Sequence, residues 1–322
     1  MVRIARRALL AALPALSTGA AAQTAWPSGP VRLVVGFPPG GGNDLLARIL
    51  AEALAAAFGR PFVVENRPGA SGVLAIEAVR RAAPDGQTLL VGPSSGMTVN
   101  PLVLPNVSYD PVRDFAPISI VGNFPLLVVV NPSNPSQNLG ALLAQARDRP
   151  GELTYASAAT SFQIATEMLA AEADVRLTHV PYRGSAPAVQ AVLSNEVTMT
   201  LGDVAAVLPL IQSGALRALA ISTDARDPAL PDVPTVAESG LPNYRVVLWS
   251  ALFAPPGTPP AITARLGAEI ARIAATPAFR ERLRPLGVQA VGSDADTLTR
   301  TMQAELERFG AVVRRAGIRM EP

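Results

Sequence analysis

A run of three glycines stands where an apolar segment passes into a helical pattern. Residues 31–37 are almost continuously apolar, residues 38–44 contain the three consecutive glycines, and residues 45–58 have the composition of an alanine-rich helix. The first turn of a helix carries unpaired backbone N–H groups and a partial positive charge, so it can hold an anion without a cationic side chain. This segment therefore predicts an anion-binding site.

Catalytic chemistry has one candidate arrangement, Ser94 with His179. Ser94 is the central serine of the only G-x-S-x-G motif, residues 92–96, and His179 is the only histidine. A nucleophile elbow needs a helix directly after the serine, and Pro101 is expected to interrupt one. We therefore interpret the motif as a Gly/Ser loop at the end of a strand. An extracytoplasmic enzyme using Ser94 and His179 stays open as the weaker alternative.

Several residue types that other chemistry requires are absent. The chain has no cysteine and no lysine, which excludes disulfides, thiol nucleophiles and Schiff-base chemistry. A single histidine excludes zinc sites built on His and Cys clusters. The glycine run lacks both the G-x-G-x-x-G spacing and a Walker lysine, so nucleotide binding is not expected. We predict no catalytic residue, no cofactor and no metal.

The N-terminal residues have the pattern of an export signal. Arg3, Arg6 and Arg7 precede an apolar stretch at residues 8–16, and three alanines end at Ala22. We expect a signal peptide over residues 1–22, cleavage near Ala22 and a periplasmic location. The adjacent arginines leave the export route, general secretory or twin-arginine, open.

Removal of this segment changes the charge of the chain. Loss of three arginines from the 27 basic side chains leaves 24 against 25 acidic ones. A nearly neutral chain has neither the basic surface that binds nucleic acid nor the one that binds a membrane. No nucleic-acid partner is therefore expected.

Strands and helices alternate along the mature sequence, which predicts an α/β fold with each sheet mostly parallel and flanked by helices. Two long extended runs, residues 118–130 and 244–254, predict two crossovers between two lobes. We assign residues 23–124 and 250–322 to lobe 1 and residues 125–249 to lobe 2. Ligands of such sheets bind beyond the carboxyl ends of the strands, where the Gly/Ser turns lie.

The last helices are expected to pack back on the first lobe. Apolar residues recur at helical spacing along residues 296–315, which indicates a face turned to the core. These residues are Leu298, Met302, Leu306, Phe309 and Val313.

Ordered motifs along the whole mature chain resemble the Bordetella-uptake-gene (Bug) family, the receptors of tripartite tricarboxylate transporters. The motifs include Phe37-Pro-Pro-Gly-Gly41 with Asp44, Val64-Glu-Asn-Arg-Pro-Gly69, Pro84-Asp-Gly86, His179-Val-Pro-Tyr182, Gly214-Ala-Leu-Arg-Ala-Leu-Ala220 and Leu230-Pro-Asp-Val-Pro-Thr235. The resemblance implies a two-lobed periplasmic binding protein of the Venus-flytrap type (type 2). It also implies a small carboxylate ligand and integral-membrane transporter subunits as partners. We expect a monomer.

The resemblance also implies where a ligand binds. The first-lobe loop supplies backbone amides that hold a carboxylate, and Ser94 supplies a hydroxyl. In the second lobe the loop after residue 155 is about two residues shorter than is usual in the family. That loop lacks glycines and has Gln163 where a histidine is common, while Arg183 stands where lysine is common. The candidate ligand-binding residues are Phe37, Pro39, Gly40, Gly41, Asn43, Asp44, Ser94, Ser157, Thr160, Ser161 and Asp203.

Three questions stay open at this point. Asp203 could accept a hydrogen bond from a ligand ammonium or hydroxyl group, or it could simply cap its helix. The ligand could be a tricarboxylate, a dicarboxylate, an amino acid or an aromatic acid. A receptor that feeds a sensor kinase would have the same cleft as one that feeds a transporter.

Overall fold

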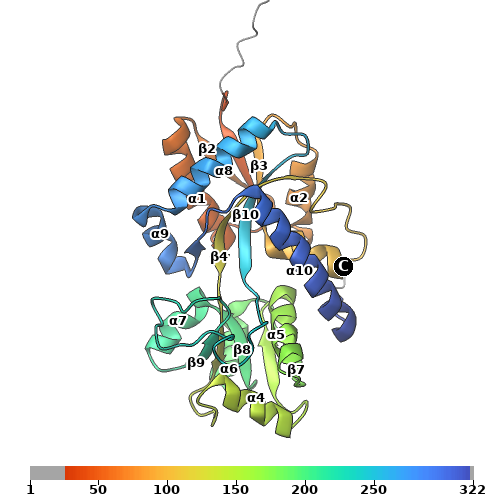
Figure 1. Cartoon of the computed structure of the whole chain (residues 1–322), viewed down its shortest axis with the longest axis vertical. Coiled ribbons are helices and arrows are strands. Elements are labelled where there is room, and N and C mark those ends of the chain that lie inside the picture. The colour runs from red at the N-terminus through yellow and green to blue at the C-terminus, as the bar shows by residue number, and fades with distance from the viewer. Residues whose placement is uncertain (1–25, 320–322) are drawn as a thin grey trace, which may run out of the picture.

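Two lobes are stacked along the longest axis of the molecule and are joined by extended strands (Figure 1). The computed structural model describes residues 26–319. The predicted signal peptide, residues 1–22, lies outside this range. No helix among the described residues combines the length and the apolar character that crossing a membrane requires.

The first lobe is built on a six-stranded sheet in the order β11-β4-β10-β3-β1-β2. Strand β1 pairs in parallel with β2 and β3, whereas β10 pairs antiparallel with β3 and β4, and β11 antiparallel with β4. The strands are β1 (Val31–Val35), β2 (Phe62–Asn66), β3 (Thr88–Pro93), β4 (Ala116–Phe124), β10 (Leu248–Ala254) and β11 (Gln289–Ala290).

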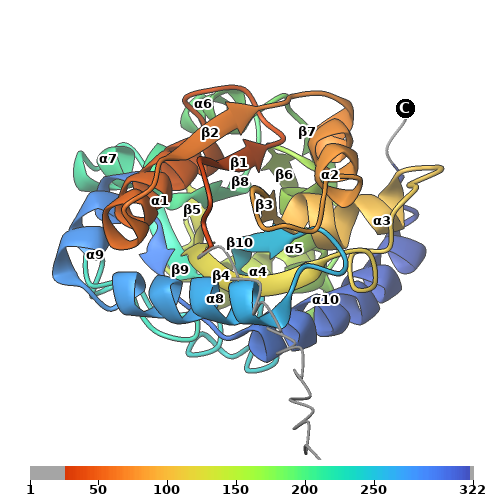
Figure 2. The same ribbon diagram turned by 90° about the horizontal axis from the view of Figure 1, so that it is seen from above.

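Helices cover both faces of this sheet, as the apolar character of its central strands requires. Neighbouring residues of β1 belong to different cores: Leu33 packs with α1 and α8, and Val34 packs with α2 and α10. Figure 2 shows the helices on the two sides of the sheet. The helices are α1 (Gly42–Phe58), α2 (Val73–Arg80), α3 (Asn100–Val103), α8 (Pro260–Ala274), α9 (Pro277–Leu283) and α10 (Ala295–Ala316).

The second lobe has a five-stranded sheet in the order β7-β6-β8-β5-β9. Val128 of β5 packs with α4 and α5 on one face, and Val129 packs with α6 and α7 on the other. The strands are β5 (Leu126–Val130), β6 (Thr154–Ser157), β7 (Thr178–Pro181), β8 (Met199–Asp203) and β9 (Arg217–Ile221). The helices are α4 (Leu139–Asp148), α5 (Thr160–Glu172), α6 (Ser185–Leu193) and α7 (Val204–Gln212).

The two-lobed α/β fold confirms the prediction, but both sheets are mixed rather than mostly parallel. In the second lobe, β6 pairs in parallel with β7 and β8, while β5 pairs antiparallel with β8 and β9. The crossovers explain the difference in the first lobe. Strand β4 leads the chain out of this lobe and β10 brings it back, so the two strands run in opposite directions where they pair.

The first extended run is present as predicted but is interrupted, and the second is shorter than predicted. Residues 118–130 form two strands separated by Pro125, which has no N–H to donate to a sheet. Of residues 244–254, only those from Leu248 onward form a strand. At each crossover the chain therefore passes from one sheet to the other through a segment that is not strand, and no single strand continues through both sheets.

Helix α10 packs on the first lobe as predicted and also reaches the second. Phe309 and Val313 lie in one apolar cluster with Ile164 of α5. Leu306, predicted to face the core, is only partly buried, and Glu305 is buried in its place. The helix thus places a carboxyl group inside the molecule, which the spacing of its apolar residues alone does not indicate.

Glu305 joins α10 to the crossover strand β10. One carboxyl oxygen accepts a hydrogen bond from Trp249 Nε1 at 2.9 Å, and the other lies 2.8 Å from Thr98 Oγ1. Thr98 Oγ1 also lies 2.9 Å from the carbonyl oxygen of Ser94. One hydroxyl hydrogen cannot fully serve two acceptors, so both contacts are satisfied when Glu305 carries a proton and donates it to Thr98.

Burial raises the pKa of Glu305 to about 7, against the hydrogen bonds from Thr98 and Trp249 and the charge of Arg308, which lower it. The hydrogen bonds at Thr98 and the raised pKa both favour the protonated form of Glu305. A carboxyl group whose pKa is raised on folding stabilises the folded state most at acidic pH. That contribution is lost as the pH rises through the folded pKa.

We predict that Glu305→Gln removes one component of the pH dependence of stability. The amide can donate to Thr98 and accept from Trp249, as the protonated acid does. The variant and the parent should be about equally stable near pH 4.5, the ordinary pKa of a glutamate. At about pH 8 the variant should be the more stable, by up to roughly 3 kcal/mol. Thermal unfolding followed by circular dichroism across this range measures the difference.

The matched control is Glu307→Gln, the same change at an exposed position of the same helix. Its unfolding temperatures should follow those of the parent at every pH. Parallel curves for Glu305→Gln and the parent would contradict the protonated state assigned to Glu305.

Candidate functional site

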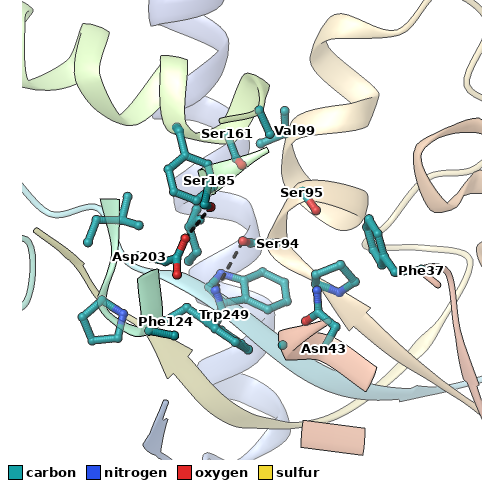
Figure 3. Close-up of a pocket in the computed structure, with 18 of the residues that line it drawn as sticks. Phe37, Asn43, Ser94, Ser95, Val99, Phe124, Ser161, Ser185, Asp203 and Trp249 are labelled. Atoms are coloured by element: carbon teal, nitrogen blue, oxygen red, sulfur yellow. Dashed lines mark hydrogen bonds between the residues drawn. The ribbon is translucent and has the colours of Figure 1, made fainter. Parts of the chain in front are cut away.

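A cavity of about 520 Å³ lies between the two lobes, with walls from both sheets and from the crossover strands. Figure 3 shows its polar side chains facing one another across the gap between the lobes, with aromatic rings among them. The polar side chains in its lining are Asn43, Ser71, Ser94, Ser95, Asn100, Thr160, Ser161, Ser185 and Asp203.

The glycine loop brings the start of α1 to this cavity. The helix begins at Gly42, three residues earlier than predicted, and Gly41 is its N-cap without a side-chain hydrogen bond. Gly42 and Asn43 are in the cavity lining. A side chain at position 42 would be crowded, because a Cβ there would lie 3.1 Å from the Phe124 ring. Glycine at this position leaves room for the Phe124 ring, and the first turn, whose N–H groups have no partner within the helix, lies at the cavity.

Asp44 holds this loop rather than lining the cavity. Its side chain is 1% exposed and accepts hydrogen bonds from Gly40 N, from Arg48 Nε at 3.0 Å and from Asn66 Nδ2 at 2.8 Å. Burial alone would raise the pKa of Asp44, but the hydrogen bonds from Arg48, Gly40 and Asn66 bring it below its ordinary value. The carboxylate is thus charged at neutral pH and fixes the loop from beneath.

The candidate residues of this loop therefore divide into two groups. Phe37 and Asn43 line the cavity, as expected of ligand-binding residues. Pro39, Gly40, Gly41 and Asp44 are not in the lining, and Pro39, Gly40 and Gly41 are exposed.

Ser94 lies at the cavity, where its hydroxyl oxygen accepts a hydrogen bond from the backbone N–H of Trp249 at 3.3 Å (Figure 3). The expected break at Pro101 is wrong. A π-helical turn at residues 95–99 follows Ser94 and continues directly into α3, whose first turn contains the proline.

Ser94 and His179 are not hydrogen-bonded to each other. His179 Nε2 lies 2.7 Å from Ser157 Oγ, and its ring packs on Tyr155 with centroids 5.0 Å apart. Burial lowers the pKa of His179, with an opposing effect of Glu167. Ser157 is 3% exposed and, like His179, is not in the cavity lining. The candidate residue Ser157 is thus a partner of the histidine.

The second-lobe loop brings two other candidates to the cavity, Thr160 and Ser161. They form the first turn of α5, whose N-cap, Ala159, has no side chain that could cap the helix. A second uncapped helix start therefore faces the cavity, from the opposite lobe to α1.

Asp203 is both a helix cap and part of the cavity wall. One carboxylate oxygen accepts the N–H of Ala206 at 3.0 Å, which caps α7, and the other accepts a hydrogen bond from the hydroxyl of Ser185. The residue remains in the lining beside Ser185 (Figure 3). Among the described residues, no group of three or more His, Cys, Asp or Glu side chains could hold a metal ion.

Sequence reasoning missed the residues that the crossovers bring to the cavity. Phe124 ends β4 just before Pro125, and Trp249 lies near the start of β10, so both stand where the chain passes between the lobes. Their position next to a predicted crossover was the available signal. The other cavity side chains that it missed include Ser71, Ser95, Asn100, Phe162, Ser185 and Leu248.

Comparison with known proteins gives one consistent family. Residues 46–318 match the family described as Tripartite tricarboxylate transporter family receptor. Protein BugT of Bordetella pertussis is 37% identical over 299 residues, which cover 92% of this chain and 92% of BugT.

Solved structures agree with this match. The structure of R. palustris Rpa4515 with adipate is 35% identical, with a TM-score of 0.77, and covers 91% of this chain and 99% of its own. MatC from Rhodopseudomonas palustris, with bound malate, is 32% identical, with a TM-score of 0.71, and covers 89% of this chain and 100% of its own. The chain belongs to the tripartite tricarboxylate transporter receptor family and is a homologue of the Bug proteins.

Proposed function

We propose that the protein is an extracytoplasmic receptor that binds a small carboxylate between its lobes and delivers it to a tripartite tricarboxylate-type membrane transporter. The observation that carries this proposal is the uncapped start of α1 at the interlobe cavity, with Gly42 and Asn43 in the lining. Adipate in Rpa4515 and malate in MatC support a carboxylate as the ligand class.

Backbone and hydroxyl donors are sufficient for useful affinity. Hydrogen bonds to a charged group contribute roughly 1.5–3 kcal/mol each, and a helix terminus adds about 0.3–2 kcal/mol. Association and ordering oppose binding by several kcal/mol. Three or four such donors therefore allow a net binding free energy of about −8 kcal/mol, which corresponds to a micromolar dissociation constant.

A ligand held by both lobes favours their closed arrangement. Donors from α1 lie in one wall of the cavity and those from α5 in the other. Only a difference in affinity between two arrangements shifts the equilibrium between them. Contacts that require both walls provide that difference.

The location, the partners and the domain division belong to the same proposal. The export pattern at residues 1–22 and the family support a periplasmic location, and membrane subunits of the transporter are the proposed partners. We retain a monomer, with residues 125–249 as the second lobe. Binding without catalysis is supported by the separate hydrogen bonds of Ser94, to Trp249, and of His179, to Ser157.

Asn43→Asp tests whether the cavity holds an anion. The change keeps the size of the side chain and the acceptor for Ser250, and an acidic residue in the first turn stabilises a helix. It also places a negative charge beside the proposed carboxylate site. Carboxylate affinity measured by calorimetry should fall at least about thirtyfold, or about 2 kcal/mol, while the unfolding temperature should not fall.

Asn138→Asp is the matched control, because Asn138 caps α4, is exposed and is not in the cavity lining. Its ligand affinity should equal that of the parent. Unchanged affinity in Asn43→Asp would argue against a carboxylate at the start of α1.

Gly287→Ala tests closure of the lobes. A Cβ at this position in the first lobe would lie 2.7 Å from Val204 Cβ and 2.9 Å from Ala205 N, which belong to α7 of the second lobe. The methyl group should hold the lobes apart. We expect affinity to fall about five- to hundredfold, the effect of an overpacked contact. Small-angle scattering in the presence of ligand should show a larger radius of gyration than for the parent.

Gly59→Ala controls for backbone strain. Gly59 has φ 64°, close to the 63° of Gly287, and no atom lies within 4 Å of a Cβ built on it. This variant should lose a similar amount of stability and keep its ligand affinity. Equal affinities in the two variants would remove Gly287 from the closure contact.

The ligand itself can be identified from protein purified from its own periplasm. Mass spectrometry of small molecules released by gentle unfolding should detect an acid, and the same acid should raise the unfolding temperature of the emptied protein. Recovery of only neutral or cationic molecules that bind again would overturn the proposed function.

A further inference from the structure

Four aromatic residues contribute to the cavity wall. Phe37, Phe124 and Trp249 come from the first lobe and the crossover strands, and Phe162 comes from α5. The only polar atom of the Trp249 side chain, Nε1, donates to Glu305. The indole ring therefore offers the cavity an apolar surface. Aromatic surfaces of this kind favour aromatic ligands, because paired rings attract each other beyond the effect of buried area.

One of these rings stands next to the proposed carboxylate donors. Phe124 packs so closely on the start of α1 that a Cβ at Gly42 would lie 3.1 Å from its ring. Gly42 and Phe124 both line the cavity. A molecule whose carboxylate reaches the first turn of α1 therefore has its adjoining atoms beside an aromatic ring.

The charges in the lining suit a single carboxylate. Of the described residues that line the cavity, none is arginine or histidine, and the whole sequence contains no lysine. The one charged side chain among the described lining residues is an anion, Asp203. No cationic side chain there would balance a second or third carboxylate, and Asp203 would repel one.

We infer that the ligand is an aromatic monocarboxylate, with its carboxylate at the start of α1 and its ring among Phe37, Phe124 and Trp249. This inference rests on the proposed function and narrows it to one class of acid. It separates this protein from its solved relatives Rpa4515 and MatC, whose structures contain the aliphatic dicarboxylates adipate and malate.

The experiment compares acids that differ in charge and ring character. Benzoate, phenylacetate and cinnamate are titrated by calorimetry into the mature protein beside cyclohexanecarboxylate, adipate and citrate. At least one aromatic acid should bind about tenfold or more tightly than adipate and citrate, because these carry additional charges that the lining does not balance. It should also bind more tightly than cyclohexanecarboxylate, which has a single carboxylate on a saturated ring.

Tryptophan fluorescence offers a second measurement of ligand binding. The chain has two tryptophans, Trp26 and Trp249. Trp26→Phe leaves Trp249 as the only one, at a cost in hydrogen bonding that should be small because Trp26 Nε1 has no partner among the described residues. The fluorescence of Trp249 should change on binding of the aromatic acid.

Phe124→Leu tests the ring contact. Leucine keeps an apolar side chain at this half-buried position, so the fold should persist. The affinity for the best aromatic acid should fall about threefold to tenfold, the range of an aromatic pair, with a smaller loss for cyclohexanecarboxylate. Phe58→Leu is the matched control: Phe58 packs on Trp26 and Phe62, outside the cavity lining, and its change should leave all affinities as they were.

The possible outcomes distinguish a failure of the proposed ligand class from a failure of the proposed receptor function. If adipate or citrate binds more tightly than every aromatic acid, the ligand class is overturned while the receptor function stands. An equal loss for aromatic and saturated acids in Phe124→Leu would likewise overturn the ring contact. If none of the acids binds, the proposed function fails and the ligand class fails with it.

Discussion

The proposed site depends on one constraint: a carboxylate has to be held although, among the described residues, no cationic side chain lines the cavity. Backbone N–H groups can do this only when a rigid loop directs them at the ligand. Asp44 serves that purpose, since its carboxylate accepts hydrogen bonds from Gly40, Arg48 and Asn66 beneath the loop. Charged groups therefore act indirectly here: the ion pair of Asp44 with Arg48 shapes the loop, and the loop presents the helix start.

The crossover strands connect this site to the packing of the whole molecule. Trp249 on β10 forms part of the cavity wall, donates its indole N–H to Glu305 of α10, and gives its backbone N–H to Ser94. Helix α10 in turn packs through Phe309 on Ile164 of the second lobe. The cavity wall, the crossover strand β10 and the contact between the lobes are therefore connected through a few side chains. A change in the relative position of the lobes must then be accommodated next to the cavity.

Local signals in the sequence were enough for the two-lobed α/β fold, whereas most of the candidate ligand-binding residues came from the family resemblance. The glycine turn before α1 and the alternation of strands and helices depend on neighbouring residues, and these predictions agree with the structure. The mixed sheets, the buried Glu305 and the pairing of Ser157 with His179 depend on residues far apart in the chain. No local pattern contains that information. Phe124 and Trp249 were missed for the same reason, because a crossover shows in the sequence only as an extended run.

In the proposed function, carboxylate binding and selectivity come from different parts of the cavity. In the first lobe the start of α1 supplies donors that suit any carboxylate, so it cannot by itself distinguish one acid from another. The second-lobe loop lacks glycines, and its Ser157 is occupied by His179, which leaves the neutral hydroxyls of Thr160 and Ser161 at the cavity. Selectivity must then come from shape and from the rings around the cavity, because neutral hydroxyls accept as readily as they donate. A receptor built this way can change its ligand by changing the aromatic wall while the carboxylate donors stay the same.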